Sequence, residues 1–140
     1  MEEFRDLAHG IYPPLLQERG LAEALANAAR RMSIATRVEA GGLRRYDPAV
    51  EATVYFCCIE ALQNAAKYAG EGATASVRVR EQENGLTFEV ADDGRGIDPA
   101  RTGHGTGLTN MRDWLGAIGG SLRIDSAPGA GTRVAGVVPL

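Results

Sequence analysis

Three polar side chains recur at helical spacing in the middle of the chain. Glu60, Asn64 and Lys67 lie four and three residues apart, so on a helix they fall within a sector of roughly 60°. An amide oxygen suits Mg²⁺, which completes its shell with phosphates and water, and an ammonium group beside it suits a phosphate. A solvated helix face with an ordinary polar pair explains the same residues, so this helix alone leaves both interpretations open.

A carboxylate at the end of a predicted strand is the second candidate. The segment Asp92-Asp93-Gly94-Arg95-Gly96 follows that strand without a break, and its two glycines let the backbone turn sharply. A buried Asp at such a place can accept a hydrogen bond from an exocyclic amine, which adenine offers and guanine replaces with a carbonyl acceptor, so specificity for adenine would follow. A plain turn between strand and helix is the alternative.

Two glycine-rich segments follow. Gly103-His104-Gly105-Thr106-Gly107-Leu108 runs into a predicted helix, whose unpaired amides and positive dipole end suit a phosphate. Its spacing fits neither the Walker pattern nor the dinucleotide fingerprint, and a flexible lid or plain loop explains it as well. Gly129-Ala130-Gly131-Thr132 joins the last two predicted strands. Thr132 is either a strand residue or a hydroxyl that orders a water against a purine.

Composition excludes several classes of function. The 140 residues suit a single domain, and a net charge of −3 without a dense basic cluster predicts that no nucleic acid is bound. The longest apolar run, Val54 to Ile59, falls short of the ~20 residues of a spanning helix, and the first residues lack the order of a signal peptide. We therefore expect a cytoplasmic domain.

The adjacent Cys57 and Cys58 suit neither a disulfide framework nor a metal site, and we expect them to be buried.

Periodicity predicts the elements that position these residues. Helices are expected over 21–32, 47–68 and 106–118, and strands over 36–40, 75–80, 86–91, 121–125 and 132–138. Asp47 is the expected cap of the long helix, whose apolar face comprises Val54, Cys58, Ala61, Leu62 and Ala65. A helical stub over 1–12 should end at Pro13 and Pro14. This order predicts an α/β (α+β) two-layer sandwich, in which three helices cover one face of a mixed sheet.

Taken in order and spacing, the four motifs resemble the N, G1, G2 and G3 boxes of the Bergerat ATP-binding fold (HATPase_c, GHKL superfamily), which histidine kinases, gyrase, Hsp90 and MutL share. The boxes are Glu60-x-x-x-Asn64-x-x-Lys67, Asp92-x-Gly94-x-Gly96, Gly103-x-Gly105-x-Gly107-Leu108 and Gly129-x-Gly131-Thr132. The resemblance runs from about Leu21 to the end of the chain. It is greatest to the sensor histidine kinases that drive NarL/LuxR-type response regulators, and the short lid between Ile97 and Leu108, without a phenylalanine box, agrees with that group.

The resemblance implies a role for each residue. Asp92 would bind the adenine amine, and Thr132 would support the adenine through a water. Asn64 would hold Mg²⁺, while Lys67 would meet the phosphates and Glu60 would assist phosphoryl transfer as a base or an orienting group. The implied catalytic set is Glu60, Asn64 and Lys67, and the implied nucleotide-binding set is Asn64, Lys67, Asp92, Gly94, Gly96, Gly103, Gly105, Thr106, Gly107, Leu108 and Thr132.

The resemblance also implies partners. Residues 17–140 would form the ATP-binding catalytic domain, which transfers the γ-phosphate of Mg-ATP to a histidine in a separate dimerisation domain for relay to a response regulator. Residues 1–16 would be a connecting segment that contains His9, and His104 would lie in the lid. We expect this chain to be a monomer and the full-length protein to be a homodimer. Whether the full-length protein has a membrane anchor is left open by the sequence. An anti-sigma-factor-type serine kinase and a non-catalytic nucleotide-binding module are the alternatives.

Overall fold

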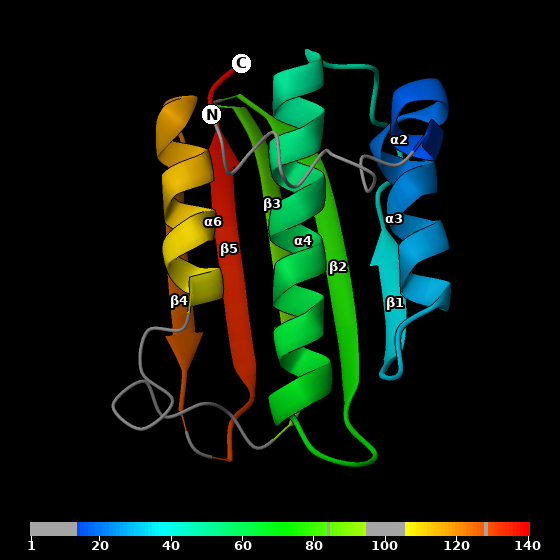
Figure 1. The fold of residues 1–140 in the computed structure, drawn as a ribbon, viewed down its shortest axis with the longest axis vertical. Helices are drawn as coiled ribbons and strands as arrows, with labels where there is room; N and C mark the ends of the chain where they lie inside the picture. Colours follow the sequence, from blue (N-terminus) through cyan, green and yellow to red (C-terminus); the bar gives the residue numbers. More distant parts are fainter. Residues whose placement is uncertain (1–13, 84, 95–105, 128) are drawn as a thin grey trace.

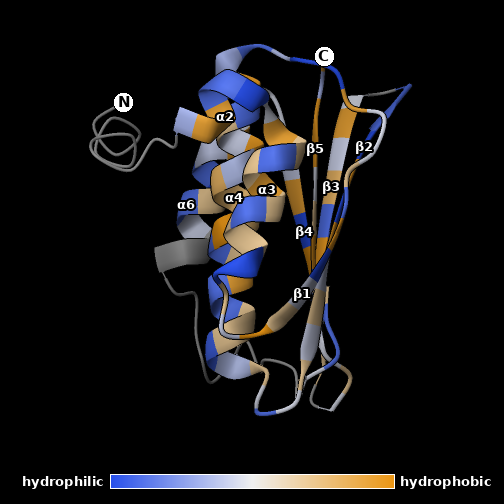
Figure 2. Cartoon of the chain, turned by 90° about the vertical axis from the view of Figure 1, so that its right-hand side faces the viewer, coloured by the Kyte–Doolittle hydropathy of each residue, from blue (hydrophilic) through white to orange (hydrophobic). Residues whose placement is uncertain are grey.

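The chain folds into two layers, a five-stranded sheet and a layer of helices on one of its faces (Figures 1 and 2). The computed structural model describes residues 14–83, 85–94, 106–127 and 129–140. None of the helices it describes lies on the opposite face of the sheet (Figure 2). The predicted two-layer α/β sandwich is therefore confirmed.

The described helices are α2 (Pro14–Arg19), α3 (Leu21–Arg30), α4 (Pro48–Tyr68) and α6 (Thr106–Ala117). The strands are β1 (Ala35–Glu39), β2 (Thr74–Gln82), β3 (Gly85–Asp92), β4 (Ser121–Ser126) and β5 (Thr132–Val138), in the order β1-β2-β3-β5-β4. Strand β1 pairs parallel with β2, and the other pairs are antiparallel. All three predicted helices and all five predicted strands are present, within a few residues of their expected ends.

The structure corrects two details at helix starts. Helix α2 begins at Pro14, where the sequence predicted that a helix ends. Proline lacks only an N–H that the first helical turn leaves unpaired, so it starts a helix as readily as it stops one. Asp47 is the N-cap of α4, as predicted, but its carboxylate makes no capping hydrogen bond. The predicted stub over 1–12 lies outside the described residues.

Helix α4 is the centre of the core. Its predicted apolar residues Val54, Cys58, Ala61, Leu62 and Ala65 are all buried, and the helix lies over the middle of the sheet (Figure 1). The inner face of the sheet supplies the facing apolar surface, with alternate residues of β2 and β3 buried: Val77, Val79, Leu86, Phe88 and Val90. This burial fixes the rotation of α4 about its axis, and so the direction of its polar face.

The two cysteines of α4 are buried thiols, as predicted. Cys57 and Cys58 are free and both are fully enclosed. Burial raises the pKa of Cys57 to about 12 and raises that of Cys58 well above its usual range. Both therefore stay protonated and act as small apolar side chains.

Along the described stretches, none of the helices combines the length and apolar character that crossing a bilayer requires.

Two close backbone contacts bring the elements together at one end of the sheet. A Cβ at Gly94 would overlap the Cβ and the carbonyl oxygen of Ala69, the residue that caps α4. A Cβ at Gly131 would likewise overlap the carbonyl oxygen of Asp92. The chain just after β3 therefore touches the end of α4 on one side and the start of β5 on the other.

A buried carboxylate ties α2 to α4 at the opposite end. The Glu51 side chain is almost fully buried and accepts hydrogen bonds from Arg45 Nε at 2.9 Å, Arg45 Nη2 at 3.0 Å and the Tyr46 N–H at 3.0 Å. Arg45 Nη2 also donates to the carbonyl oxygens of Leu16 and Gln17 in α2, at 3.3 and 3.0 Å. Burial alone would raise the pKa of Glu51, but these hydrogen bonds hold it below its usual value.

We predict that Arg45→Ala destabilises the fold by about 2 kcal/mol at pH 7, because the buried Glu51 charge loses its cation and the last carbonyls of α2 lose a donor. The contribution of Glu51 is complete above its ordinary pKa of 4.5 and is lost as the pH falls through its lower folded-state pKa. The deficit of the variant should therefore shrink in acid. Urea unfolding at pH 7 and at pH 3 measures it.

Arg44→Ala is the matched control. Arg44 pairs with the exposed Glu81 at 2.8 Å, and an exposed pair contributes little to stability. Equal losses for the two arginine variants would contradict the role given to Glu51.

Candidate functional site

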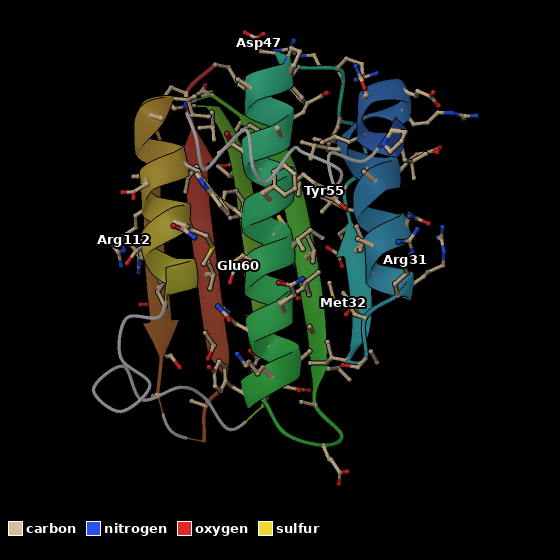
Figure 3. All side chains as sticks on the ribbon, viewed as in Figure 1. Arg31, Met32, Asp47, Tyr55, Glu60 and Arg112 are labelled. Carbon is tan, nitrogen blue, oxygen red and sulfur yellow. The ribbon has the colours of Figure 1, made fainter. Side chains whose placement is uncertain are left out.

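The polar face of α4 forms one wall of the candidate site. Glu60 and Asn64 are half-buried and Lys67 is exposed in the last turn of the helix. Figure 3 shows Glu60 on the side of α4 that faces α6, in keeping with Phe56, one turn earlier, whose ring lies 6.4 Å from that of Trp114 in α6. The helical spacing places Asn64 and Lys67 on the same side, so this polar face opens between the two helices.

Asp92 forms the second wall, on the helix-covered face of the sheet. It follows the buried alternation of β3 through Leu86, Phe88 and Val90. It is paired in register with Thr132 on β5, which is paired in turn with Ser126 on β4.

Two hydroxyls lie beside this carboxylate. Thr132 is 9% exposed, and its Oγ1 lies 2.8 Å from Ser126 Oγ. The two hydroxyls therefore continue the row of polar groups that Asp92 begins at this strand end.

The electrostatic setting of Asp92 is that of a partly desolvated acceptor. Burial raises the pKa of its carboxyl, the N–H groups of Gly94 and Thr132 act to lower it, and the charge of Asp93 adds to the rise. The Gly94 N–H donates to Asp92 Oδ1 at 2.9 Å. An ionised carboxylate in such a setting gains more from a hydrogen-bond donor than it would in water.

The fold brings these walls together at one end of the molecule. Figure 1 shows the end of α4, the end of β3 and the start of β5 at the same end, and α6 begins in the half of the molecule nearer to it. The contact between Gly94 and Ala69 joins the first two. Helix α6 begins at Thr106, as expected, so the positive end of its dipole also points to this region. The amide of Asn64, the ammonium of Lys67, the Asp92 carboxylate and the start of α6 therefore lie toward the same half of the molecule.

Part of the predicted site lies outside the described residues. Gly96, Gly103 and Gly105 lie outside the described residues, and so does His104. Thr106, Gly107 and Leu108 form the first turn of α6. In the parts of the chain that the structure describes, no group of three or more His, Cys, Asp or Glu side chains is placed to hold a metal ion.

Sequence reasoning missed two residues beside the site. Ser126 shares a hydrogen bond with the Thr132 hydroxyl, and Asp93 makes two side-chain hydrogen bonds to Thr74 at the start of β2. The register of the sheet creates both contacts. The sequence offers only two local signals for these contacts: Ser126 is a hydroxyl residue just before the last turn, and Asp93 is a second acid directly after Asp92.

We predict that Asp92→Asn raises the melting temperature of the ligand-free protein at pH 7, because the amide keeps the acceptor for Gly94 but carries no charge to desolvate. A carboxyl with a raised folded-state pKa destabilises the fold above that pKa, and the penalty vanishes below the unfolded-state value. Thermal melts from pH 7 to pH 3 should show the advantage of the variant shrinking. A lower melting temperature at pH 7 would contradict this electrostatic assignment.

Comparison with known proteins agrees with this geometry. The family model described as histidine kinase-, DNA gyrase B- and HSP90-like ATPase (HATPase_c) matches residues 49–140. The chain is 31% identical over 141 residues to the signal transduction histidine-protein kinase/phosphatase UhpB of Salmonella typhimurium, covering 96% of this chain and 28% of that protein. It is 30% identical over 148 residues to the sensor histidine kinase MctS of Rhizobium johnstonii, covering 99% and 32%. The chain thus spans about a third of these curated relatives.

Solved structures share the fold. The blue-light activated histidine kinase of Erythrobacter litoralis EL346 superposes with a TM-score of 0.75 at 23% identity, over 86% of this chain and 42% of that one. The mycobacterial sensor histidine kinase MprB gives a TM-score of 0.61 at 24% identity, over 85% and 92%. The resemblance seen in the four boxes is confirmed by the family match, and the chain belongs to the histidine kinase-, DNA gyrase B- and HSP90-like ATPase family.

Proposed function

We propose that this chain is the ATP-binding catalytic domain of a two-component sensor histidine kinase, which binds Mg-ATP and transfers the γ-phosphoryl group to a histidine of a dimerisation domain. One observation carries the proposal: the half-buried Asp92 lies in register with Thr132, at the end where the polar face of α4 terminates. The relatives UhpB and MctS, both named as histidine kinases, support it.

Asp92 is the proposed adenine anchor. Its carboxylate accepts a hydrogen bond from the exocyclic amine of adenine, whereas the carbonyl of guanine would face it with a second acceptor and be repelled. The Thr132 hydroxyl, held by Ser126 at 2.8 Å, supports the same purine edge through a water. The pair therefore selects the base.

The polar face of α4 is the proposed phosphate and metal wall. The half-buried Asn64 offers a neutral oxygen of the kind Mg²⁺ accepts, and the bound metal would neutralise charge on the phosphates. Lys67 pairs with phosphate oxygens as a mobile cation, and Glu60 acts as a base or orients the attacking group. Phosphoryl transfer depends mainly on such positioning and charge neutralisation, and the first turn of α6, with Thr106, Gly107 and Leu108, adds backbone donors.

The partners follow from the same proposal. The acceptor histidine belongs to a dimerisation hairpin, from which a response regulator takes the phosphoryl group. The relatives are more than three times as long as this chain, so the full-length protein, a proposed homodimer, would supply that hairpin. The domain itself would act in the cytoplasm as a monomer.

Calorimetric titration with ATP, with and without Mg²⁺, tests the site. Wild type should bind ATP more tightly with Mg²⁺. Asp92→Asn should weaken ATP binding by about 100-fold, the value of a hydrogen bond to a buried charge, and Asn64→Ala should remove most of the Mg²⁺ dependence. Asp47→Asn, at the opposite end of α4 (Figure 3), and Asn27→Ala in α3 are matched controls that should bind as wild type does. An unchanged titration for Asp92→Asn would refute the adenine assignment.

Transfer is tested with the dimerisation hairpin of the same full-length protein and labelled ATP. We expect label on the hairpin that is lost in acid, as phosphohistidine is. Acid-stable label on a serine would favour the anti-sigma-factor type of kinase instead. Tight ATP binding without any transfer to the hairpin would favour a non-catalytic module.

A further inference from the structure

A second acid follows the proposed adenine anchor and points elsewhere. Successive strand residues face opposite sides, and Asp93 is exposed while Asp92 is half-buried. Asp93 Oδ1 accepts the Thr74 N–H at 2.7 Å, Asp93 Oδ2 accepts the Thr74 hydroxyl at 2.8 Å, and the Asp93 N–H donates to the Thr74 carbonyl oxygen at 3.1 Å. Three hydrogen bonds thus join Asp93 to Thr74, the first residue of β2.

These bonds extend the sheet by one step past its last pair. The register of β2 and β3 ends at Ala75 opposite Asp92, and the final pair of a ladder opens more easily than the interior. Beyond it the chain turns away at Gly94, which lies against Ala69. The Asp93 N–H makes one bond of the next step of the ladder, and the Asp93 carboxylate accepts the Thr74 N–H that a backbone carbonyl would otherwise accept, so the backbone next to Asp92 is held from the β2 side.

The other sides of Asp92 are already fixed. On the β5 side it pairs with Thr132, and its carbonyl oxygen lies against Gly131. On the helix side Gly94 contacts Ala69. On the β2 side, beyond the pair of Asp92 with Ala75, the two side-chain hydrogen bonds of Asp93 to Thr74 add to the backbone bond between the same residues.

We infer that Asp93 is a positioning residue that acts through Thr74 to orient the Asp92 carboxylate, and so sets how strongly the site selects the exocyclic amine of adenine. The inference rests on the proposed function. A hydrogen-bond acceptor must be held within about half an ångström of its productive place. Without the hydrogen bonds between Asp93 and Thr74, the end of β3 would move further than that. Asp93 itself touches no part of the nucleotide.

A purely structural role for Asp93 makes a different prediction. Loosening the fold would weaken every nucleotide by the same factor. Misplacing Asp92 would weaken only the bond to the amine, so purine riboside triphosphate, which differs from ATP in lacking that amine, would bind as before. The ratio of the two dissociation constants therefore separates the two roles.

The experiment titrates wild type, Asp93→Ala, Thr74→Val and the double variant with each nucleotide in the presence of Mg²⁺. We expect Asp93→Ala to lower the preference for ATP over purine riboside triphosphate by about tenfold, the effect of one charged hydrogen bond made poorly. Thr74→Val should lower it less, because the Thr74 N–H still reaches Asp93. The double variant should be no worse than Asp93→Ala, since both act on one contact.

Two conservative variants serve as controls. Asp93→Asn keeps an acceptor for the N–H and gains a donor for the hydroxyl, and Thr74→Ser keeps the hydroxyl, so both should retain the wild-type preference. An unchanged preference in Asp93→Ala and in Thr74→Val, with both nucleotides weakened alike, would overturn the inference. If Asp93→Ala does not fold, Thr74→Val decides by itself. A wild type that does not prefer ATP over the analogue would refute the adenine assignment itself.

Discussion

The close approach of Gly94 to Ala69 governs the architecture of this domain. Because a Cβ at Gly94 would overlap Ala69, the end of α4 and the chain just after β3 meet without a side chain between them. That contact joins two otherwise separate features, a helix with a polar face and a strand that ends in an acid. The matching approach of Gly131 to the Asp92 carbonyl adds β5 to the same place.

The two ends of α4 each lie near an acid, and the two acids differ in how well the fold compensates their charge. At the start of α4 the buried Glu51 is fully compensated by Arg45 and the Tyr46 N–H, and its lowered pKa reflects a favourable ionised state. At the other end Asp92 is half-buried, and its pKa is raised. An acid that the fold leaves under-compensated is a common mark of a functional site, because a ligand supplies the missing partner.

The sequence predicted the parts of this structure that depend on local pattern. Alternation located the strands, and the positive φ angles of Gly70 and Gly72 follow α4 where the sequence placed its end. Pro14 was misjudged because proline suits both the first turn of a helix and the residue after one. The hydrogen bonds between Asp93 and Thr74 could not be predicted, since the two residues are 19 positions apart and meet only through the register of β2 and β3. The spacing of Glu60, Asn64 and Lys67 predicted one shared face, but only the structure shows that Glu60 lies on the side of α4 toward α6.

The most direct test of the account is a crystal structure of this chain with a non-hydrolysable ATP analogue and Mg²⁺. The account predicts the adenine amine within hydrogen-bond distance of Asp92, and the metal and phosphates against Asn64 and Lys67 at the end of α4. A nucleotide bound elsewhere, or an adenine that does not contact Asp92, would contradict it.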